Sequence, residues 1–192
     1  MKNYDFLVIG SNGLLGSKIV KILKKKKINH LTIARKNSNF NLNLKNFKSL
    51  NKLFLKNRFR VVINCAAIID INYCESKFNE ALIINCKLVK FLSEMSKKFD
   101  FKFVQISTDH VYKGKKLKLN HEQSEIFAIN KYTKTKILAE KYLKRLNNFL
   151  IIRTNFTGKK KNTFIDWLVK SIKSKKIINL FHDMYTSTMD VN

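Results

Sequence analysis

The stretch that decides the fold spans residues 4–27 and reads YDFLVIGSNGLLGSKIVKILKKKK. Its first seven residues form an almost wholly apolar run, which indicates a buried strand. From Leu14 onward the apolar residues recur every three or four positions, which indicates a helix with one apolar face. Three of the five glycines in the chain, Gly10, Gly13 and Gly16, lie between these two elements. The stretch therefore predicts a strand, a tight glycine turn and a helix.

Such a glycine turn is what a bound dinucleotide requires. Glycine lets the chain turn tightly, lets a pyrophosphate approach the backbone and lets the helix pack closely on the strand. The helix that follows offers free N–H groups and a positive dipole to the phosphates. A tight turn without a ligand is the alternative, but the strand–turn–helix context is the one that the motif requires. We therefore expect a dinucleotide site here.

Outward from this stretch, apolar runs and helical patterns alternate along the chain. Strands are expected at residues 31–34, 61–69, 101–107 and 149–153, and helices at residues 46–56, 76–99 and 131–146. Continuous apolar strands are typical of a parallel sheet that helices cover on both faces. The pattern predicts an α/β fold with a doubly wound parallel sheet, in which residues 1–153 form a dinucleotide-binding domain.

The pattern changes after residue 153. A helix is expected at residues 163–173 and a short strand at residues 177–181, followed by only eleven residues. We interpret residues 154–192 as the beginning of a small substrate-binding domain.

The basic composition does not by itself indicate a nucleic-acid partner. The net charge is +26, but 34 of the 39 basic residues are Lys, and Pro is absent. Codon usage in an AT-rich genome favours this composition, and the lysines are spread along the chain, so we expect a solvated surface and no nucleic-acid partner. Strongly salt-dependent duplex binding would support the opposite interpretation.

Other features of the composition indicate a soluble globular protein of the cytoplasm. No stretch approaches the roughly 18 apolar residues of a membrane helix, and the first residues do not form a secretory signal. The three cysteines, Cys65, Cys74 and Cys86, lack the spacing of metal ligands and indicate a reducing compartment. We expect no membrane partner and no bound metal.

Four further blocks resemble a known family. They are INCAAIIDINYCE (Ile63–Glu75), QISTDHVYKG (Gln105–Gly114), NKYTKTKILAEKYL (Asn130–Leu143) and IIRTNF (Ile151–Phe156). Together with the GxxGxxG turn, they resemble the extended short-chain dehydrogenase/reductase family, and within it most closely the dTDP-4-dehydrorhamnose reductase family.

The resemblance implies a Rossmann fold and NADPH-dependent reduction of the 4-keto group of a nucleotide-linked deoxy sugar, in polysaccharide biosynthesis. It also implies a nucleotide-sugar substrate as partner, and a homodimer is possible. The alternative is a non-catalytic dinucleotide-binding module or regulatory subunit on the same fold.

The same resemblance implies three catalytic residues. Tyr132 would protonate the carbonyl oxygen as hydride arrives, Lys136 would depress the pKa of the phenol and bind the nicotinamide ribose, and Thr108 would orient the carbonyl oxygen. The Tyr-x-x-x-Lys spacing alone is not specific, because Tyr73 and Tyr112 also precede a Lys by four residues. Context favours Tyr132, which begins a long predicted helix some two dozen residues after a Ser-Thr pair at a strand end.

The cofactor is expected to be NADPH, with NADH possible. An NAD site normally places an acidic residue after the second strand, but the chain has none between Asp5 and Asp70, and Arg35 stands at that strand's end. A guanidinium is suited to binding a phosphate. By resemblance, the pyrophosphate would be lined by Gly10, Ser11, Asn12, Gly13, Leu14, Leu15 and Gly16. The adenine would be bordered by Asn43 and Leu44, and the nicotinamide side by Ala66 and Ala67. Asn85, on a predicted helix, would lie near the cofactor.

Two features bear on the reaction that the resemblance implies. Dehydratases of the superfamily carry an Asp-Glu pair after the threonine, whereas Asp109 is here followed by His110, which favours a simple reductase. We expect His110 to lie in a loop near the substrate.

The family continues for roughly another third of a chain. We therefore expect the helix at 163–173 to leave apolar residues exposed, namely Phe164, Trp167, Leu168 and Ile172. For the same reason we expect the chain to bind the dinucleotide but to reduce keto-sugars slowly.

Overall fold

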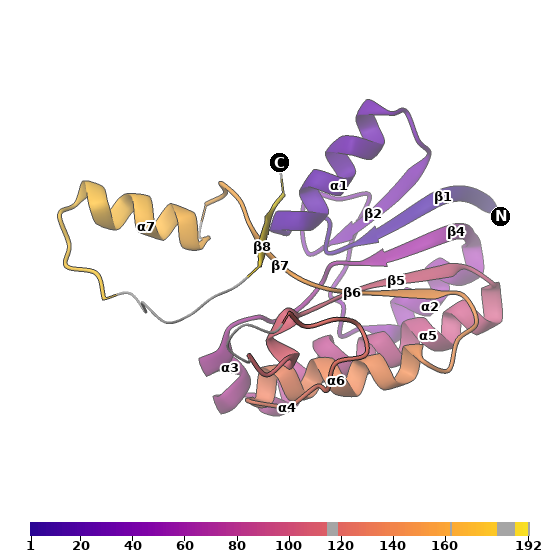
Figure 1. Cartoon of the computed structure of the whole chain (residues 1–192). Coiled ribbons are helices and arrows are strands. Elements are labelled where there is room, and N and C mark those ends of the chain that lie inside the picture. Colours follow the sequence, from indigo (N-terminus) through magenta and orange to yellow (C-terminus); the bar gives the residue numbers. More distant parts are fainter. Residues whose placement is uncertain (115–118, 162, 180–186, 192) are drawn as a thin grey trace.

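A six-stranded parallel sheet with the order β3-β2-β1-β4-β5-β6 forms the centre of the computed structural model (Figure 1). Its strands are β1 (Lys2–Ile9), β2 (His30–Ala34), β3 (Phe40–Asn41), β4 (Asn57–Asn64), β5 (Lys102–Ser107) and β6 (Phe149–Arg153). The structure describes residues 1–114, 119–161, 163–179 and 187–191. The predicted doubly wound α/β fold is confirmed.

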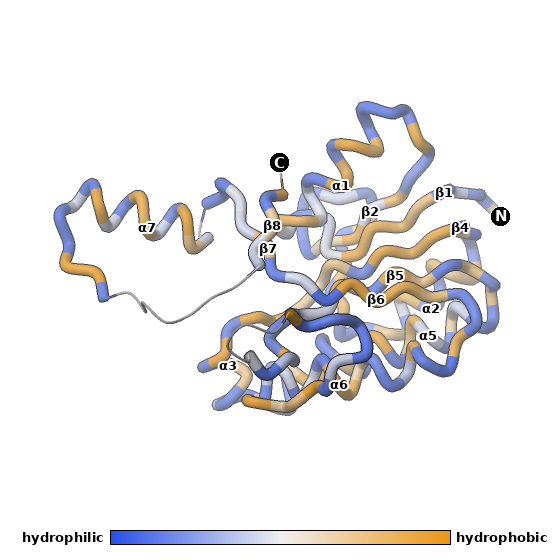
Figure 2. The backbone as a smooth tube through the Cα atoms, viewed as in Figure 1, coloured by the Kyte–Doolittle hydropathy of each residue, from blue (hydrophilic) through white to orange (hydrophobic). Residues whose placement is uncertain are grey.

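Helices cover both faces of this sheet (Figure 1). Helix α1 (Leu14–Lys25) lies on one face, and α2 (Phe47–Lys56), α5 (Leu88–Phe99) and α6 (Lys131–Leu143) lie on the other. The main apolar core lies under the second group, where Phe54 of α2 stacks on Phe101 with ring centroids 5.5 Å apart. Figure 2 shows the apolar residues concentrated along the sheet strands, as expected for strands buried on both faces.

The order of the strands places a switch point between β1 and β4. From β1 the chain winds outward through β2 and β3, and then returns to form β4, β5 and β6 on the other side of β1. In doubly wound sheets, ligands bind beyond the carboxyl ends of the strands at such a point. The glycine turn follows β1 and the Ser-Thr pair closes β5, so both lie at this carboxyl edge.

The long helix predicted at residues 76–99 is present from Phe78 to Phe99, with a π-helical turn within it, and a separate short helix that was not predicted precedes it. The segment consists of α3 (Ile71–Ser76), α4 (Phe78–Leu82), a π-helical turn (Ile83–Lys87) and α5. Lys77 separates α3 from α4 with a non-helical φ of −122° and ψ of 47°. The π turn is centred on Asn85, whose side chain bonds to another segment.

Strand boundaries differ from the prediction in two places. Strand β4 begins at Asn57, directly after α2, and ends at Asn64, five residues earlier than expected, because the chain then leaves the sheet toward Asn85. The strand expected at 177–181 is not formed at residues 177–179, and its last two residues lie outside the described residues. Instead, β7 (Asn155–Thr157) pairs in parallel with β8 (Thr188–Asp190).

Helix α7 (Phe164–Lys173) follows β7 and extends away from the sheet (Figure 1). Its predicted apolar face is largely exposed: Phe164 by 61%, Trp167 by 47% and Ile172 by 63%, while Leu168 is half-buried. Within the described residues, no helix combines the length and the apolar character needed to cross a membrane.

Candidate active site at the carboxyl edge of the sheet

The glycine turn leaves no room for a side chain at Gly10 or Gly16. Gly10 has a φ of +77°, and a Cβ there would lie 2.8 Å from the Ala66 backbone nitrogen. A Cβ on Gly16 would lie 2.3 Å from the Gly10 carbonyl oxygen, so α1 packs directly on the turn. The backbone N–H groups of Gly10 and Ser11 both donate to the Ile33 carbonyl, and the Ser11 hydroxyl does so as well. The turn is therefore fixed against β2.

The first turn of α1 has neither a capping side chain nor an acidic residue that would compete with an anion. Its N-cap, Gly13, forms no side-chain cap hydrogen bond, and the first turn, which includes Leu14, Leu15 and Gly16, contains no acidic residue. The leading N–H groups of a helix without a cap need an external acceptor, and the helix dipole favours a negative one. The residues present therefore fit a dinucleotide pyrophosphate.

A second segment lies beside the turn. The Asn12 side chain donates to the Lys36 carbonyl, which joins the glycine turn to the loop after β2. Arg35, next to Lys36, is exposed at this edge of the sheet. Arg35 thus directly follows β2 and precedes the residue that Asn12 contacts.

The two residues expected to border an adenine follow β3. The Asn43 side-chain oxygen accepts from the Lys45 backbone N–H, so part of this side chain shapes its own turn. Leu44 is half-buried and packs against the core. Both lie at the carboxyl edge, on the β2–β3 side of the glycine turn.

The segment after β4 forms the other wall of the site. Ala66 and Ala67 are half-buried, and Ala66 contacts Gly10 so closely that only glycine fits there. Asn85 is 1% exposed; it accepts from the Ile68 N–H and donates to the Ile68 carbonyl and to the Thr135 hydroxyl. Asn85 thus holds this wall in place and links it to α6, and it is not a solvent-exposed residue.

The three expected catalytic side chains come together between β5 and α6. Thr108, Tyr132 and Lys136 are 5%, 8% and 2% exposed. Burial raises the pKa of Tyr132, while a hydrogen bond with the Thr108 side chain opposes part of that rise. The predicted depression of the Tyr132 pKa by Lys136 is not seen in this structure, because burial outweighs the other influences and Lys136 is not among them.

Lys136 is deeply buried one helical turn after Tyr132. Its ammonium donates to the Ile106 carbonyl at 2.7 Å. Burial lowers the pKa of Lys136 to about 8, and the nearby Glu140 carboxylate opposes this. Burial also raises the pKa of the neighbouring Cys65 thiol to about 12, so that thiol is neutral at neutral pH.

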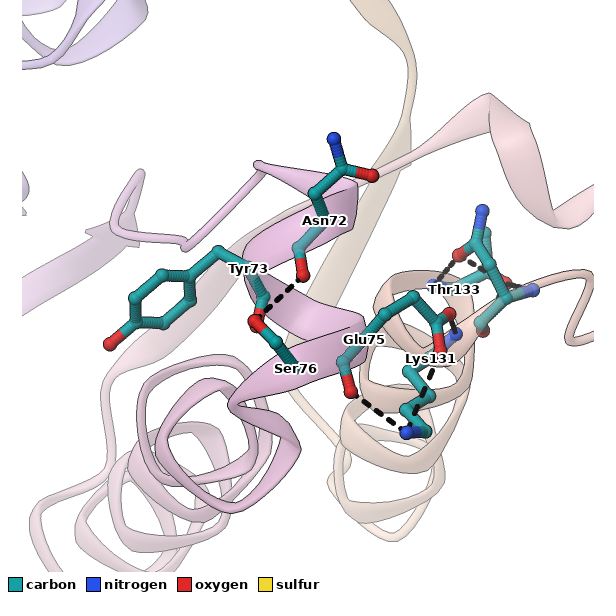
Figure 3. Close-up of polar contacts among 7 residues, drawn as sticks. Asn72, Tyr73, Glu75, Ser76, Lys131 and Thr133 are labelled. Atoms are coloured by element: carbon teal, nitrogen blue, oxygen red, sulfur yellow. Dashed lines mark hydrogen bonds and ion pairs between the residues drawn. The ribbon is translucent and has the colours of Figure 1, made fainter.

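The start of α6, which carries Tyr132, is held by two sets of contacts (Figure 3). Asn130 and Thr133 form a capping box, each side chain accepting from the other's backbone N–H. The Glu75 carboxylate of α3 accepts from the Lys131 backbone N–H at 2.7 Å, and the Lys131 ammonium donates to the Glu75 carbonyl at 2.8 Å. These contacts fix the residue that immediately precedes Tyr132.

The other two Tyr-x-x-x-Lys matches lie in different surroundings. The Tyr73 hydroxyl donates to Glu80 at 3.1 Å on an exposed surface. The Tyr112 hydroxyl accepts from Arg153 at 2.8 Å, and Lys116 lies outside the described residues. Neither hydroxyl is hydrogen-bonded to Thr108.

Asp109 and His110 follow Thr108 directly. The Thr108 hydroxyl accepts from the His110 backbone N–H. Asp109 Oδ1 is buried without a hydrogen-bond partner in the described part of the chain and lies 4.0 Å from His110 Nε2. Both residues lie on a short 3-10 turn beside the Tyr132 phenol, whose pKa the Asp109 charge raises.

Sequence reasoning missed a buried ionic network next to these residues. Glu140, 1% exposed, accepts from the Ser107 hydroxyl at 2.6 Å and from the Arg153 guanidinium at 2.6 Å. A signal was present, because Glu140 follows Lys136 by four residues and therefore lies on the same face of α6. Arg153 is also one of only five arginines.

Comparison with known proteins decides the family of this fold and site. The profile of the RmlD substrate binding domain family matches residues 4–191. The chain belongs to this family. Its members are sugar-nucleotide reductases, so the resemblance to the extended short-chain dehydrogenase/reductases and their dTDP-4-dehydrorhamnose reductase branch is confirmed.

Relatives of known name agree with this placement. The chain is 26% identical, over 92% of its length, to a dTDP-4-dehydrorhamnose reductase of Aggregatibacter actinomycetemcomitans, of which it covers 60%. It is 25% identical, over 94% of its length, to a spore coat polysaccharide biosynthesis protein of Bacillus subtilis, of which it covers 63%. The chain thus spans less than two thirds of the length of these relatives.

A solved structure shows the same fold. The crystal structure of dTDP-4-dehydrorhamnose reductase from Bacillus anthracis in complex with NADP superposes with a TM-score of 0.81 at 26% identity, over 93% of this chain and 62% of that one. The Rossmann fold predicted for this chain is therefore confirmed.

Proposed function

We propose that this chain binds NADPH and carries the catalytic residues of a cytoplasmic reductase, which converts the 4-keto group of a nucleotide-linked deoxy sugar to an alcohol in polysaccharide biosynthesis. The observation that carries this proposal is the group Thr108, Tyr132 and Lys136, buried at the carboxyl edge beside an uncapped glycine turn. The named relatives, which include keto-sugar reductases and a structure in complex with NADP, support the same reaction class.

The proposed chemistry needs one hydride and one proton. A bound NADPH supplies the hydride to the carbonyl carbon. Tyr132 donates its phenolic proton to the carbonyl oxygen; because burial raises the pKa of Tyr132, the phenol is protonated at neutral pH and ready to donate. The Thr108 hydroxyl, hydrogen-bonded with Tyr132, positions the phenol and the substrate oxygen.

Lys136 and the two walls of the site have supporting roles. The Lys136 ammonium, held by the Ile106 carbonyl beside the catalytic group, would bind the nicotinamide ribose of NADPH. The glycine turn and α1 bind the pyrophosphate, and Arg35 binds the 2′-phosphate that distinguishes NADPH from NADH. The 4-keto sugar then lies over Tyr132, near Asp109 and His110.

Two measurements on the purified chain test this proposal. We expect NADPH to bind and to be consumed slowly with a dTDP-linked 4-keto-6-deoxy sugar. We expect Tyr132→Phe to abolish this consumption while leaving NADPH affinity nearly unchanged, because only the proton donor is lost. Retention of more than about a tenth of the wild-type rate would show that Tyr132 is not the acid. Binding without consumption by the wild-type chain would favour the dinucleotide-binding module instead.

A further inference from the structure

The Glu140–Arg153 ion pair is the most extensively bonded buried charge in the described part of the chain. Arg153 Nε lies 3.1 Å and 3.2 Å from the two Glu140 oxygens, and a second guanidinium nitrogen lies 2.6 Å from Oε2. The Ser107 hydroxyl donates to Oε1 at 2.6 Å. The Glu140 side chain is 2% exposed and the Arg153 side chain 12% exposed, so water screens the pair little.

The ion pair joins three elements that surround the candidate catalytic group. Glu140 lies on α6, two helical turns after Tyr132 and one turn after Lys136, so the three share one helix face. Ser107 immediately precedes Thr108 at the end of β5, and Arg153 ends β6. The ion pair therefore holds the tyrosine helix at a fixed distance from the strand end that carries Thr108.

Arg153 also reaches the loop that follows β5. Its remaining nitrogen donates to the Tyr112 hydroxyl at 2.8 Å and to the Glu122 carbonyl at 3.1 Å, and the guanidinium lies 5.3 Å from the centre of the Tyr112 ring. Through Arg153, α6 is linked to the Tyr112 side chain and to the Glu122 backbone of this loop.

Stability alone does not explain a buried pair of this kind. The cost of desolvating two charges can exceed their mutual attraction, and a protein with apolar residues of similar volume in their place is often at least as stable.

The charged groups that act on Lys136 are Glu140 on its own helix and the Cys65 thiol after β4. Because Cys65 is neutral at neutral pH, Glu140 is the carboxylate that acts on the Lys136 ammonium.

We propose that Glu140 and Arg153 are positioning residues for Lys136: the pair locks α6 against the ends of β5 and β6 and so holds the Lys136 ammonium at the Ile106 carbonyl, with the Glu140 carboxylate on the same helix face as its counter-charge. The inference rests on the proposed function for the importance of Lys136. The electrostatic step can be tested without that function, because the ionisation of Lys136 can be measured directly.

The test is a pH titration of isotope-labelled lysine side chains by NMR, with the Lys136 signal assigned by its loss in Lys136→Arg. Lys136 of the wild-type chain should titrate near pH 8. In Glu140→Gln the midpoint should fall by roughly one pH unit or more, because an attractive charge is lost and Arg153 remains. In Arg153→Gln it should rise, because the Glu140 charge is no longer balanced.

Opposite shifts distinguish this role from a purely structural one. If the pair only held the fold together, both variants would let water reach Lys136 and both midpoints would rise toward the ordinary lysine value. A rise or no change in Glu140→Gln overturns the proposal. The matched control is Glu94→Gln, which neutralises an exposed glutamate on α5 and should leave the Lys136 midpoint unchanged.

Two further measurements keep the test decisive if Glu140→Gln does not fold, and separate this proposal from the proposed function. If Glu140→Gln alone does not fold, the double variant Glu140→Gln/Arg153→Gln is compared with Arg153→Gln. The Lys136 midpoint must then be lower in the double variant, because the carboxylate is lost. An equal midpoint in these two variants overturns the proposal. NADPH affinity is then measured at pH values above and below the midpoint. Shifts of the predicted sign with no change in affinity would support the positioning of Lys136 and count against its place in the cofactor site.

Discussion

Replacement of Arg35 by Ala should change the choice between the two nicotinamide cofactors. Arg35 is exposed directly after β2, beside the loop that Asn12 joins to the glycine turn. A hydrogen bond between charged groups contributes about 1.5–3 kcal/mol, and each 1.4 kcal/mol changes a dissociation constant tenfold. Because Arg35 is exposed, salt screens its charge, and we expect a loss of binding energy near the lower end of this range. NADPH should therefore bind about tenfold more weakly to Arg35→Ala, while the affinity for NADH stays the same.

The assay for Arg35 is a calorimetric titration of both dinucleotides at two salt concentrations. The matched control is Arg60→Ala, which removes one positive charge from β4 where the Arg60 side chain is 82% exposed and paired with Asp5. This control should leave both affinities unchanged, because Arg60 lies outside the carboxyl edge. Equal weakening of NADPH and NADH in Arg35→Ala would refute a contact with the 2′-phosphate.

Three other perturbations follow from the site geometry. Gly10→Ala should weaken dinucleotide binding at least tenfold in the same titration, because its Cβ would meet the Ala66 backbone at 2.8 Å; unchanged affinity would mean that the turn does not approach the ligand. Asn130→Ala should lower the free energy of unfolding by about 1 kcal/mol in urea, since it removes the N-cap of α6, and a loss below the error of the assay would contradict this. The free energy of unfolding should rise by about 1 kcal/mol between pH 7 and pH 9, because Lys136, with a pKa of about 8 when folded and 10.5 when unfolded, binds fewer protons in the folded state above pH 8. The Lys136→Met variant should lack this rise in the free energy of unfolding, whereas Lys141→Met, at an exposed lysine of the same helix, should keep it. Equal pH profiles for the two variants would show that Lys136 does not cause the rise.

The fold was predictable where a pattern is local. The apolar run before Gly10 and the three- and four-residue spacing after Leu14 are properties of neighbouring residues, and they predicted β1 and α1 to within two residues at each end. The parallel sheet followed from the same alternation. Local patterns predicted the helix that ends at Phe99, but neither the short helix α3 before it nor the π turn within it, because no Pro or Gly marks either feature.

The contacts within the candidate site were less predictable, because they join residues far apart in sequence. Asn85 meets Ile68 seventeen residues away, and Glu140 meets Ser107 thirty-three residues away. In a chain rich in Asn and Lys, a single polar residue on a helix gives no indication that it is buried. Spacing could indicate which face Glu140 shares with Lys136, but not that Arg153 would come from β6 to bind it.

Helix α6 combines the chemistry and the stability of the site in one element. Residues four apart on one face, Tyr132, Lys136 and Glu140, place the proposed proton donor, a cation and its counter-charge in a row against the ends of β5 and β6. The helix is fixed at its start by Glu75 and near its end by Arg153. A rigid helix transmits a displacement at either end along its length. The contact between Tyr132 and Thr108 therefore depends on ion pairs that touch neither residue, and the chain must keep charged groups buried there despite their desolvation cost.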